Sequence, residues 1–132
     1  MKILVYVDLE NGAPTSFSRE LANGARGLAG VEGTVDLALF GADPEAVGDM
    51  NADRILYGAA SSNYDPSVHG AWLDRAIEEC KPDLILFGYT TSGLDLGPVV
   101  AMRRDLPLLS YCKAVRLAGG KVEVDSHIYG GK

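Results

Sequence analysis

The stretch LILFGYTTSGLDLGPVVAMRRDLP, residues 84–107, passes from an apolar run through a polar, glycine-broken segment into a helical pattern. An uninterrupted apolar run is typical of a strand that is covered on both faces of a parallel sheet. The polar segment begins where this strand ends, and ligands of open α/β sheets bind beyond the carboxyl ends of strands. The stretch therefore predicts a strand–loop–helix junction with a candidate binding site in the loop.

Three further apolar runs, Ile3–Val7, Val35–Phe40 and Arg54–Tyr57, have the same nearly continuous character. Helical patterns separate these runs, including a short one over Pro44–Met50. Alternation of strands and helices indicates an α/β fold, doubly wound, with a mainly parallel sheet and helices on both faces. At 132 residues, we expect a single domain, residues 1–132.

The first helix is predicted from apolar residues that recur every three or four positions, Phe17, Leu21, Ala25 and Leu28. Thr15 or Ser16 is placed to cap its first turn, and Gly30 is placed to end it. Gly24 and Gly27 lie inside the helix, where each costs about 1 kcal/mol relative to alanine. We interpret them as sites of close packing against the sheet, with packing against a partner as the alternative.

The second helix has a start signal at Asp65-Pro66 and a stop signal at Pro82. Its apolar face is predicted to carry Val68, Trp72, Ala76 and Cys80, which recur at four-residue intervals.

After Pro107 the pattern changes to the alternating segment CKAVRLAGGKVEVDSHIY, residues 112–129. The turn signal Ala118-Gly119-Gly120 predicts a C-terminal antiparallel hairpin, which we expect to extend one edge of the sheet. Strand-like sequence continues almost to Lys132, so a partner is expected to cover the edge there unless the chain is part of something longer.

Charge, apolar run length and cysteine spacing argue against several classes of function. The formal net charge of −6 disfavours nucleic acid and anionic membranes as partners, and Arg103-Arg104 is interpreted as a helix C-terminus rather than a basic patch. The start MKILVYVD predicts a strand rather than a signal peptide, and no apolar run is long enough to span a membrane. Cys80 and Cys112, far apart in sequence, are interpreted as buried thiols of a cytoplasmic protein.

Catalytic motifs are missing. The sequence has neither a dinucleotide fingerprint nor a phosphate loop, and it has no nucleophile elbow. His69 and His127 have no nucleophile or orienting acid at a recognisable spacing, so surface or structural roles are favoured for both. A component that is not itself an enzyme is therefore favoured over a hydrolase.

Candidate cofactor-binding residues follow the first and fourth predicted strands. These are Asp8, whose carboxylate suits a ribose hydroxyl, and the loop residues Thr90, Thr91, Ser92 and Gly93. Asp95 is placed to cap the next helix, with Pro98 in its first turn, and the free amides of that helix suit an anion. The alternative is that the loop hydroxyls only satisfy nearby backbone amides.

Two segments resemble a known family. The segment KPDLILFGYTTSGLDLGPVVAMRRDLPLLSYCKAV, residues 81–115, and the ending VDSHIYGGK, residues 124–132, resemble the N-terminal domain of the electron-transfer flavoprotein alpha subunit. The resemblance extends through the segments YDPSVHGAWLDRAI and SRELANGARGLAG to nearly the whole chain. Two arginines of the family segment are Leu94 and Val99 here, so the contacts that they make are lost.

The resemblance implies an adenine nucleotide alpha hydrolase-like fold and a role as a carrier component in electron transfer. It implies a heterodimer with a beta-like subunit, with self-association as the alternative, and FAD as the cofactor. The family's main FAD-binding domain is absent from these 132 residues, so its flavin-binding residues have no counterparts here. A second hypothesis, which the strand-end residues support, is a stand-alone adenine-nucleotide-binding module like universal stress proteins, with AMP as a candidate ligand.

Overall fold

A computed structural model gives the structure of this chain. It describes residues 2–10, 13–30, 32–41, 44–48, 50, 52–58, 66–87, 91–104, 112–118 and 121–126. The predictions for Asp65, Thr90, Cys112 as a buried thiol and His127 lie wholly or partly outside what is described.

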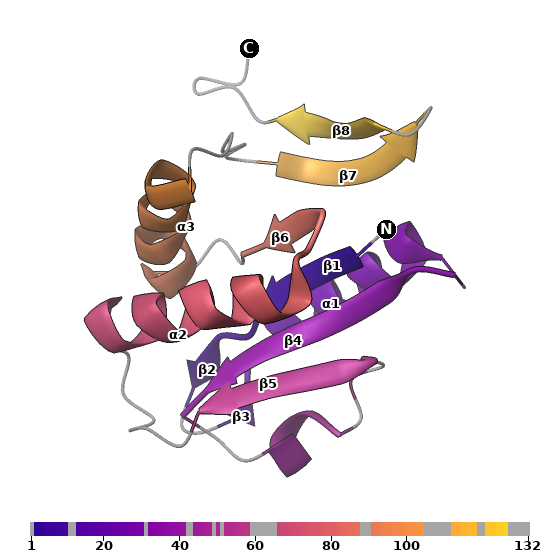
Figure 1. Cartoon of the computed structure of the whole chain (residues 1–132). Helices are drawn as coiled ribbons and strands as arrows, with labels where there is room; N and C mark the ends of the chain where they lie inside the picture. The colour runs from indigo at the N-terminus through magenta and orange to yellow at the C-terminus, as the bar shows by residue number, and fades with distance from the viewer. Residues whose placement is uncertain are drawn as a thin grey trace.

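Four parallel strands form the main sheet, in the order β5-β4-β1-β6 (Figure 1). Their bounds are β1 Lys2–Tyr6, β4 Thr34–Phe40, β5 Arg54–Gly58 and β6 Leu84–Leu86. From β1 the chain adds β4 and then β5 on one side, and it returns to place β6 on the other side of β1. This reversal of strand order defines a doubly wound α/β sheet, as predicted.

Helices cover both faces of the sheet, again as predicted (Figure 1). The helix α1 (Ser16–Ala29) packs on one face, and α2 (Pro66–Cys80) and α3 (Thr91–Arg104) pack on the other. Because successive side chains of a strand point to opposite faces, β1 contributes Ile3 and Val5 to the first face and Leu4 and Tyr6 to the second. Because both faces of the sheet are covered, successive residues of a strand are mostly apolar, and this explains the continuous apolar runs in the sequence.

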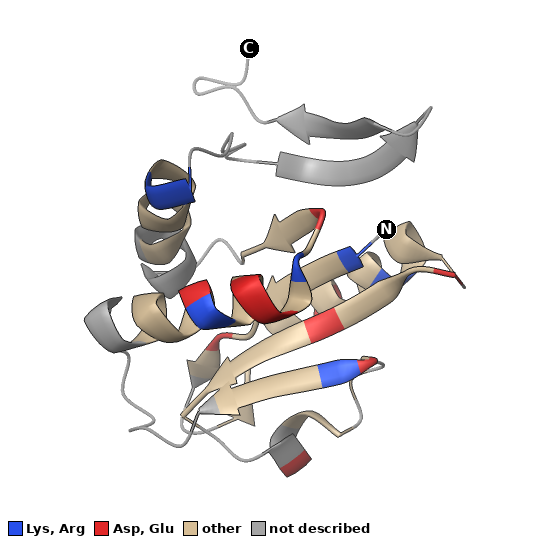
Figure 2. Cartoon of the chain, in the orientation of Figure 1, with Lys and Arg blue, Asp and Glu red and all other residues tan. Residues whose placement is uncertain are grey.

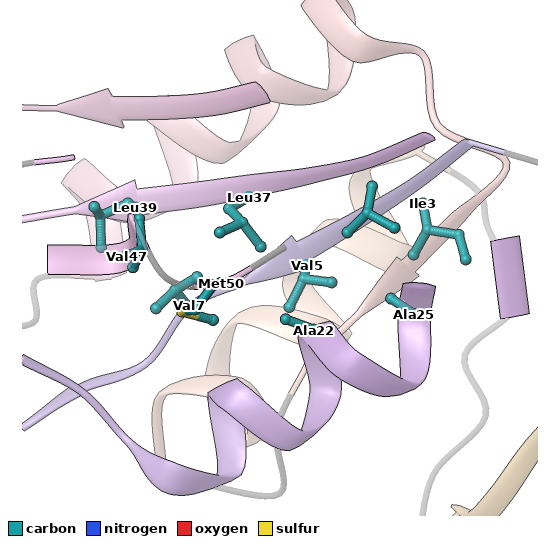
Figure 3. Packing of buried hydrophobic residues seen from close by; sticks show 10 residues of the cluster. Ile3, Val5, Val7, Ala22, Ala25, Leu37, Leu39, Val47 and Met50 are labelled. Atoms are coloured by element: carbon teal, nitrogen blue, oxygen red, sulfur yellow. The ribbon is translucent and has the colours of Figure 1, made fainter. Parts of the chain in front are cut away.

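The core on the α1 side is built from small helix residues against large strand residues (Figure 3). Ala22 and Ala25 of α1 face Val5 and Leu37 of the sheet, and all four are at most 2% exposed. The 3-10 helix η1 (Pro44–Val47) adds Val47 to this cluster, within the range where a short helix was predicted. Small alanines allow the helix to lie close to the strands.

The predicted ends of α1 are confirmed. The Oγ1 atom of Thr15 accepts a hydrogen bond from the backbone N–H of Ser18 at 3.1 Å, which caps the first turn. Gly30, with φ of 75°, ends the helix, and its N–H bonds the carbonyl of Arg26 at 3.1 Å. The interpretation that Gly24 and Gly27 pack closely against the sheet is wrong, because a Cβ at either position would meet nothing within 4 Å.

The predicted bounds of α2 are also confirmed, since it begins at Pro66 and ends at Cys80, two residues before Pro82. Its buried side chains include Ala76 and Cys80 as predicted, and also Leu73 and Ile77.

The start of α3 corrects a prediction. The helix begins at Thr91, so Asp95 lies within it rather than capping it, and Pro98 is internal rather than in the first turn. Pro98 is exposed, so the backbone hydrogen bond that it interrupts lies toward solvent, where water can replace the missing partner.

Two pairs of antiparallel strands complete the described elements. The strands β2 (Leu9–Glu10) and β3 (Ala13–Pro14) form a small pair after β1 that was not predicted. The strands β7 (Cys112–Ala118) and β8 (Lys121–Ser126) form the predicted hairpin, with Ala118 opposite Lys121. Among the residues that the structure describes, this hairpin is a sheet of its own, so the expected pairing with the edge of the main sheet is not observed.

Candidate functional site

The reversal of strand order places the candidate site between β1 and β6. These strands are parallel neighbours, with Val5 opposite Leu86, so their carboxyl ends reach the same edge of the sheet. Asp8 follows β1, and α3 is the next described element after β6, so Asp8 and the start of α3 lie at this edge. The carboxyl edge at such a reversal is the usual ligand position in open α/β sheets.

Asp8 is held in place by the first turn of α1. Its backbone N–H donates to Oγ of Ser18 at 2.8 Å, and its carbonyl accepts from the backbone N–H of Thr15 at 3.0 Å. Asp8 is 5% exposed and Ser18 is fully buried. No sequence pattern indicated this role of Ser18, because its partner is ten positions away and outside the helix.

The loop residues are placed only in part. Thr91, Ser92 and Gly93 form the first turn of α3, whose N–H groups have no partner within the helix. Such a turn carries a partial positive charge that suits an anion. The structure thus brings Asp8 and the start of α3 to one edge of the sheet, while Thr90 lies outside the described residues.

An aromatic cluster lies at the same end of the sheet, on the α2 face. The hydroxyl of Tyr6 and Nδ1 of His69 are 2.9 Å apart in a buried hydrogen bond. The rings of Phe40 and Phe87 pack near that of Tyr6, with centroids 6.2 and 5.8 Å away, and Trp72 packs against Phe40 at 5.5 Å. His69 is therefore buried and hydrogen-bonded to Tyr6, which argues against a surface role.

A second polar group lies in the other half of the sheet, away from the site. Asp36 of β4 is 3% exposed and accepts a hydrogen bond from Arg54 of β5 at 3.3 Å. Burial, with Asp36 close by, raises the pKa of the Cys80 thiol to about 12. Cys80 is thus a buried neutral thiol, as predicted, and not a nucleophile.

Arg103 and Arg104 link α3 to α2 rather than form a basic patch. Arg103 binds Asp74, and Arg104 binds Asp74 at 3.2 Å and Glu78 at 2.9 Å. These four residues line a shallow surface hollow of about 540 Å³. Figure 2 shows that one end of α3 is basic and that α2 carries both signs of charge. Because the charges in the hollow already neutralise each other, it is a weak candidate for a ligand site.

Neither a metal site nor a membrane span is found among the described residues. In the described part of the chain, the acidic, histidine and cysteine side chains form no group of three that could hold a metal ion. No helix there combines the length and the apolar character needed to cross a bilayer.

Comparison with known proteins decides the family. The family model described as "Electron transfer flavoprotein domain" matches residues 3–132. This chain belongs to that family. The residues matched to the electron transfer flavoprotein domain contain all of the elements described above, including the hairpin, apart from Lys2 at the start of β1.

The curated relatives of this electron transfer flavoprotein domain are alpha subunits and a protein named FixB. The chain is 27% identical to "Electron transfer flavoprotein subunit alpha" of Bacillus subtilis, over 99% of this chain and 42% of that protein. It is 29% identical to the "Electron transfer flavoprotein subunit alpha" of Thermoanaerobacterium thermosaccharolyticum, over 83% of this chain and 36% of that protein. It is 30% identical to "Protein FixB" of Bradyrhizobium diazoefficiens, over 98% of this chain and 38% of that protein. The chain spans about two-fifths of the length of these relatives.

Proposed function

We propose that this chain acts as the N-terminal domain of an electron-transfer flavoprotein alpha-type component, which associates with a beta-like subunit in the cytoplasm. The observation that carries the proposal is the family match over residues 3–132, together with relatives that are named alpha subunits. In this role the domain is a carrier component and not a catalyst.

The flavin is proposed to bind mainly outside these residues. A flavin ring needs an accessible flat apolar surface, and the aromatic rings nearest to the candidate edge do not offer one, because Tyr6 is 2% exposed and Phe40 is 4% exposed. Their faces are used in the core, where they pack on His69, Phe87 and Trp72. The buried rings of Tyr6 and Phe40 therefore offer no surface to the ring of FAD, and we propose that the domain supports the flavin by association.

The test is binding to a purified beta-like electron-transfer flavoprotein subunit. We expect the two proteins to co-elute in size-exclusion chromatography and to bind with a measurable heat in calorimetry. A suitable control is a universal stress protein of similar size, which has no reason to bind the beta-like subunit. A chain that does not bind any beta-like subunit, while remaining folded by circular dichroism, would contradict the proposal.

The second candidate function is adenine-nucleotide binding at the carboxyl edge of the sheet. This function is favoured because Asp8 and the start of α3 lie at that same edge. Asp8 would bind a ribose hydroxyl, and Thr90, Thr91, Ser92 and Gly93 would surround a phosphate. Calorimetry with AMP, ATP and FAD tests this function. Binding of AMP that Asp8→Asn weakens supports it, and the absence of heat with all three nucleotides removes it.

A further inference from the structure

The structure describes two of the three methionines of this chain, and their surroundings are opposite. Met50 is 5% exposed and packs in the core on the α1 side, whereas Met102 of α3 is 85% exposed. A peroxide oxidises a methionine only where it reaches the sulfur atom, so the reaction follows exposure. The two thioethers should therefore differ strongly in reactivity while the chain is folded.

Met102 lies on the outer face of α3, which we define by Pro98, Val99 and Met102. Pro98 and Val99 are exposed as well, Val99 at 46%, and they lie about one helical turn before Met102. The buried side of the helix carries Leu96 and Val100, which are at most 2% exposed in the core beside α2. A chemical change at Met102 therefore alters the outer face and leaves these core contacts in place.

The C-terminal end of α3 is held by contacts that do not use the side chain of Met102. Arg103 and Arg104 both form ion pairs with Asp74, and Arg104 also pairs with Glu78. Oxidation to the sulfoxide keeps the length of the side chain but makes it polar. Because the Met102 side chain is mostly in solvent already, the fold should tolerate this change.

We propose that Met102 is a site of reversible oxidation by hydrogen peroxide, and that its sulfoxide makes the outer face of α3 more polar without unfolding the chain. The Sδ atom attacks one oxygen of the peroxide, and the O–O bond breaks as the S–O bond forms. The proton of the attacked oxygen moves to the second oxygen, which leaves as water. The sulfur loses two electrons, and the peroxide gains them.

The reverse step is the reaction of methionine sulfoxide reductases, which act on exposed sulfoxides. Two thiols supply the electrons and become a disulfide, and the sulfoxide oxygen leaves as water. The inference does not depend on flavin or nucleotide binding.

The first test is the rate at which each methionine gains oxygen from dilute hydrogen peroxide, measured by mass spectrometry of the peptides. In the folded chain, Met102 should gain oxygen at least about tenfold faster than Met50. In urea, where both side chains are exposed, the two rates should be similar. Equal rates in the folded chain, or a Met102 that is oxidised more slowly than Met50, would overturn the proposal.

The second test is the polarity of the surface, measured by hydrophobic interaction chromatography. Treated wild type should give an earlier-eluting fraction whose added oxygen is on the Met102 peptide, and methionine sulfoxide reductases A and B with a thiol should remove both changes. Met102→Gln, which is polar and of similar length, should elute early without peroxide. Met102→Leu is the matched control, since it stays apolar and should not yield the oxidised fraction.

Thermal melts by circular dichroism compare the fold of these species. The oxidised fraction and both variants should melt as the wild type does. An oxidised fraction that is unfolded, one that elutes with the untreated chain, or a Met102 sulfoxide that the reductases do not reduce would contradict the proposal.

Discussion

The buried hydroxyl of Ser18 fixes the backbone of Asp8. Oγ of Ser18 accepts the hydrogen bond from the Asp8 N–H at 2.8 Å, and it lies 3.4 Å from the Asp8 carbonyl, to which it donates. Oγ1 of Thr15, the cap of α1, lies 3.1 Å from Oγ of Ser18. The end of β1 and the start of α1 are thus joined through one side chain, and this junction sets the position of the acid at the carboxyl edge.

Removing this hydroxyl should destabilise the fold. Ser18→Ala leaves the Asp8 N–H buried without its partner, and we expect the free energy of unfolding to fall by about 1–3 kcal/mol. The measurement is urea denaturation followed by circular dichroism. Ser16→Ala is the matched control, because Ser16 is exposed in the same turn and should change the free energy by no more than about 0.5 kcal/mol. Equal effects of the two substitutions would contradict this role of Ser18.

Shortening a side chain in the centre of the α1-side core should cost more. Leu37 is fully buried between the sheet and α1, so Leu37→Ala leaves a cavity and should lower the free energy of unfolding by about 2–5 kcal/mol. The control is Met102→Ala on α3, where the side chain is 85% exposed and the effect should be within about 0.5 kcal/mol. A Leu37→Ala variant as stable as the wild type in urea would show that this core is not packed as described.

The thiol of Cys80 should be inert in the folded chain. Burial and the neighbouring Asp36 raise its pKa to about 12, so almost none of it is thiolate at neutral pH. A maleimide should therefore label Cys80 only after unfolding, as judged by mass spectrometry of its peptide with and without urea. Complete labelling of Cys80 within minutes in native buffer is the contrary result.

Local chemistry made most of the fold predictable from sequence. Continuous apolar runs indicated strands that are buried on both faces, and Thr15, Gly30 and Pro66 marked helix ends through rules that involve only neighbouring residues. The start of α3 was misplaced because Asp95 and Pro98 carry the signals of a helix start, yet an exposed proline is tolerated eight positions into the helix. The two-residue strands β2 and β3 are too short to produce a periodic pattern.

The site was less predictable because its contacts are not local. Asp8 and the loop before α3 were identified from the general position of strand ends, but Ser18 and Tyr6 gave no signal of their own. The partner of Tyr6, His69, lies 63 positions away in sequence. Such pairs follow from the order of the strands, and a single sequence does not encode that order in any periodic pattern.

The carboxylate of Asp53 should make stability depend on acid pH. Its Oδ2 accepts from the backbone N–H of Val35 at 2.8 Å and from Arg26 at 2.8 Å, and these two contacts, the amide first, hold the pKa of Asp53 below its usual range. A carboxyl whose pKa is lower in the folded state stabilises the fold at pH values above its unfolded pKa, about 3.9. That contribution is lost as the pH falls through the lower, folded pKa. Asp53→Asn should therefore be less stable than the wild type at pH 7, and the difference should shrink below pH 4.

Urea denaturation of the wild type and Asp53→Asn at several pH values measures this difference. Glu45→Gln is the control, since Glu45 is an exposed acid of η1, and its effect on stability should not follow the same pH dependence. Because Asp53 is itself partly exposed, added salt should weaken the contact with Arg26 more than that with the Val35 amide. A difference between the wild type and Asp53→Asn that stays constant from pH 7 to pH 3 would show that the carboxylate charge does not contribute to the stability of this corner of the sheet.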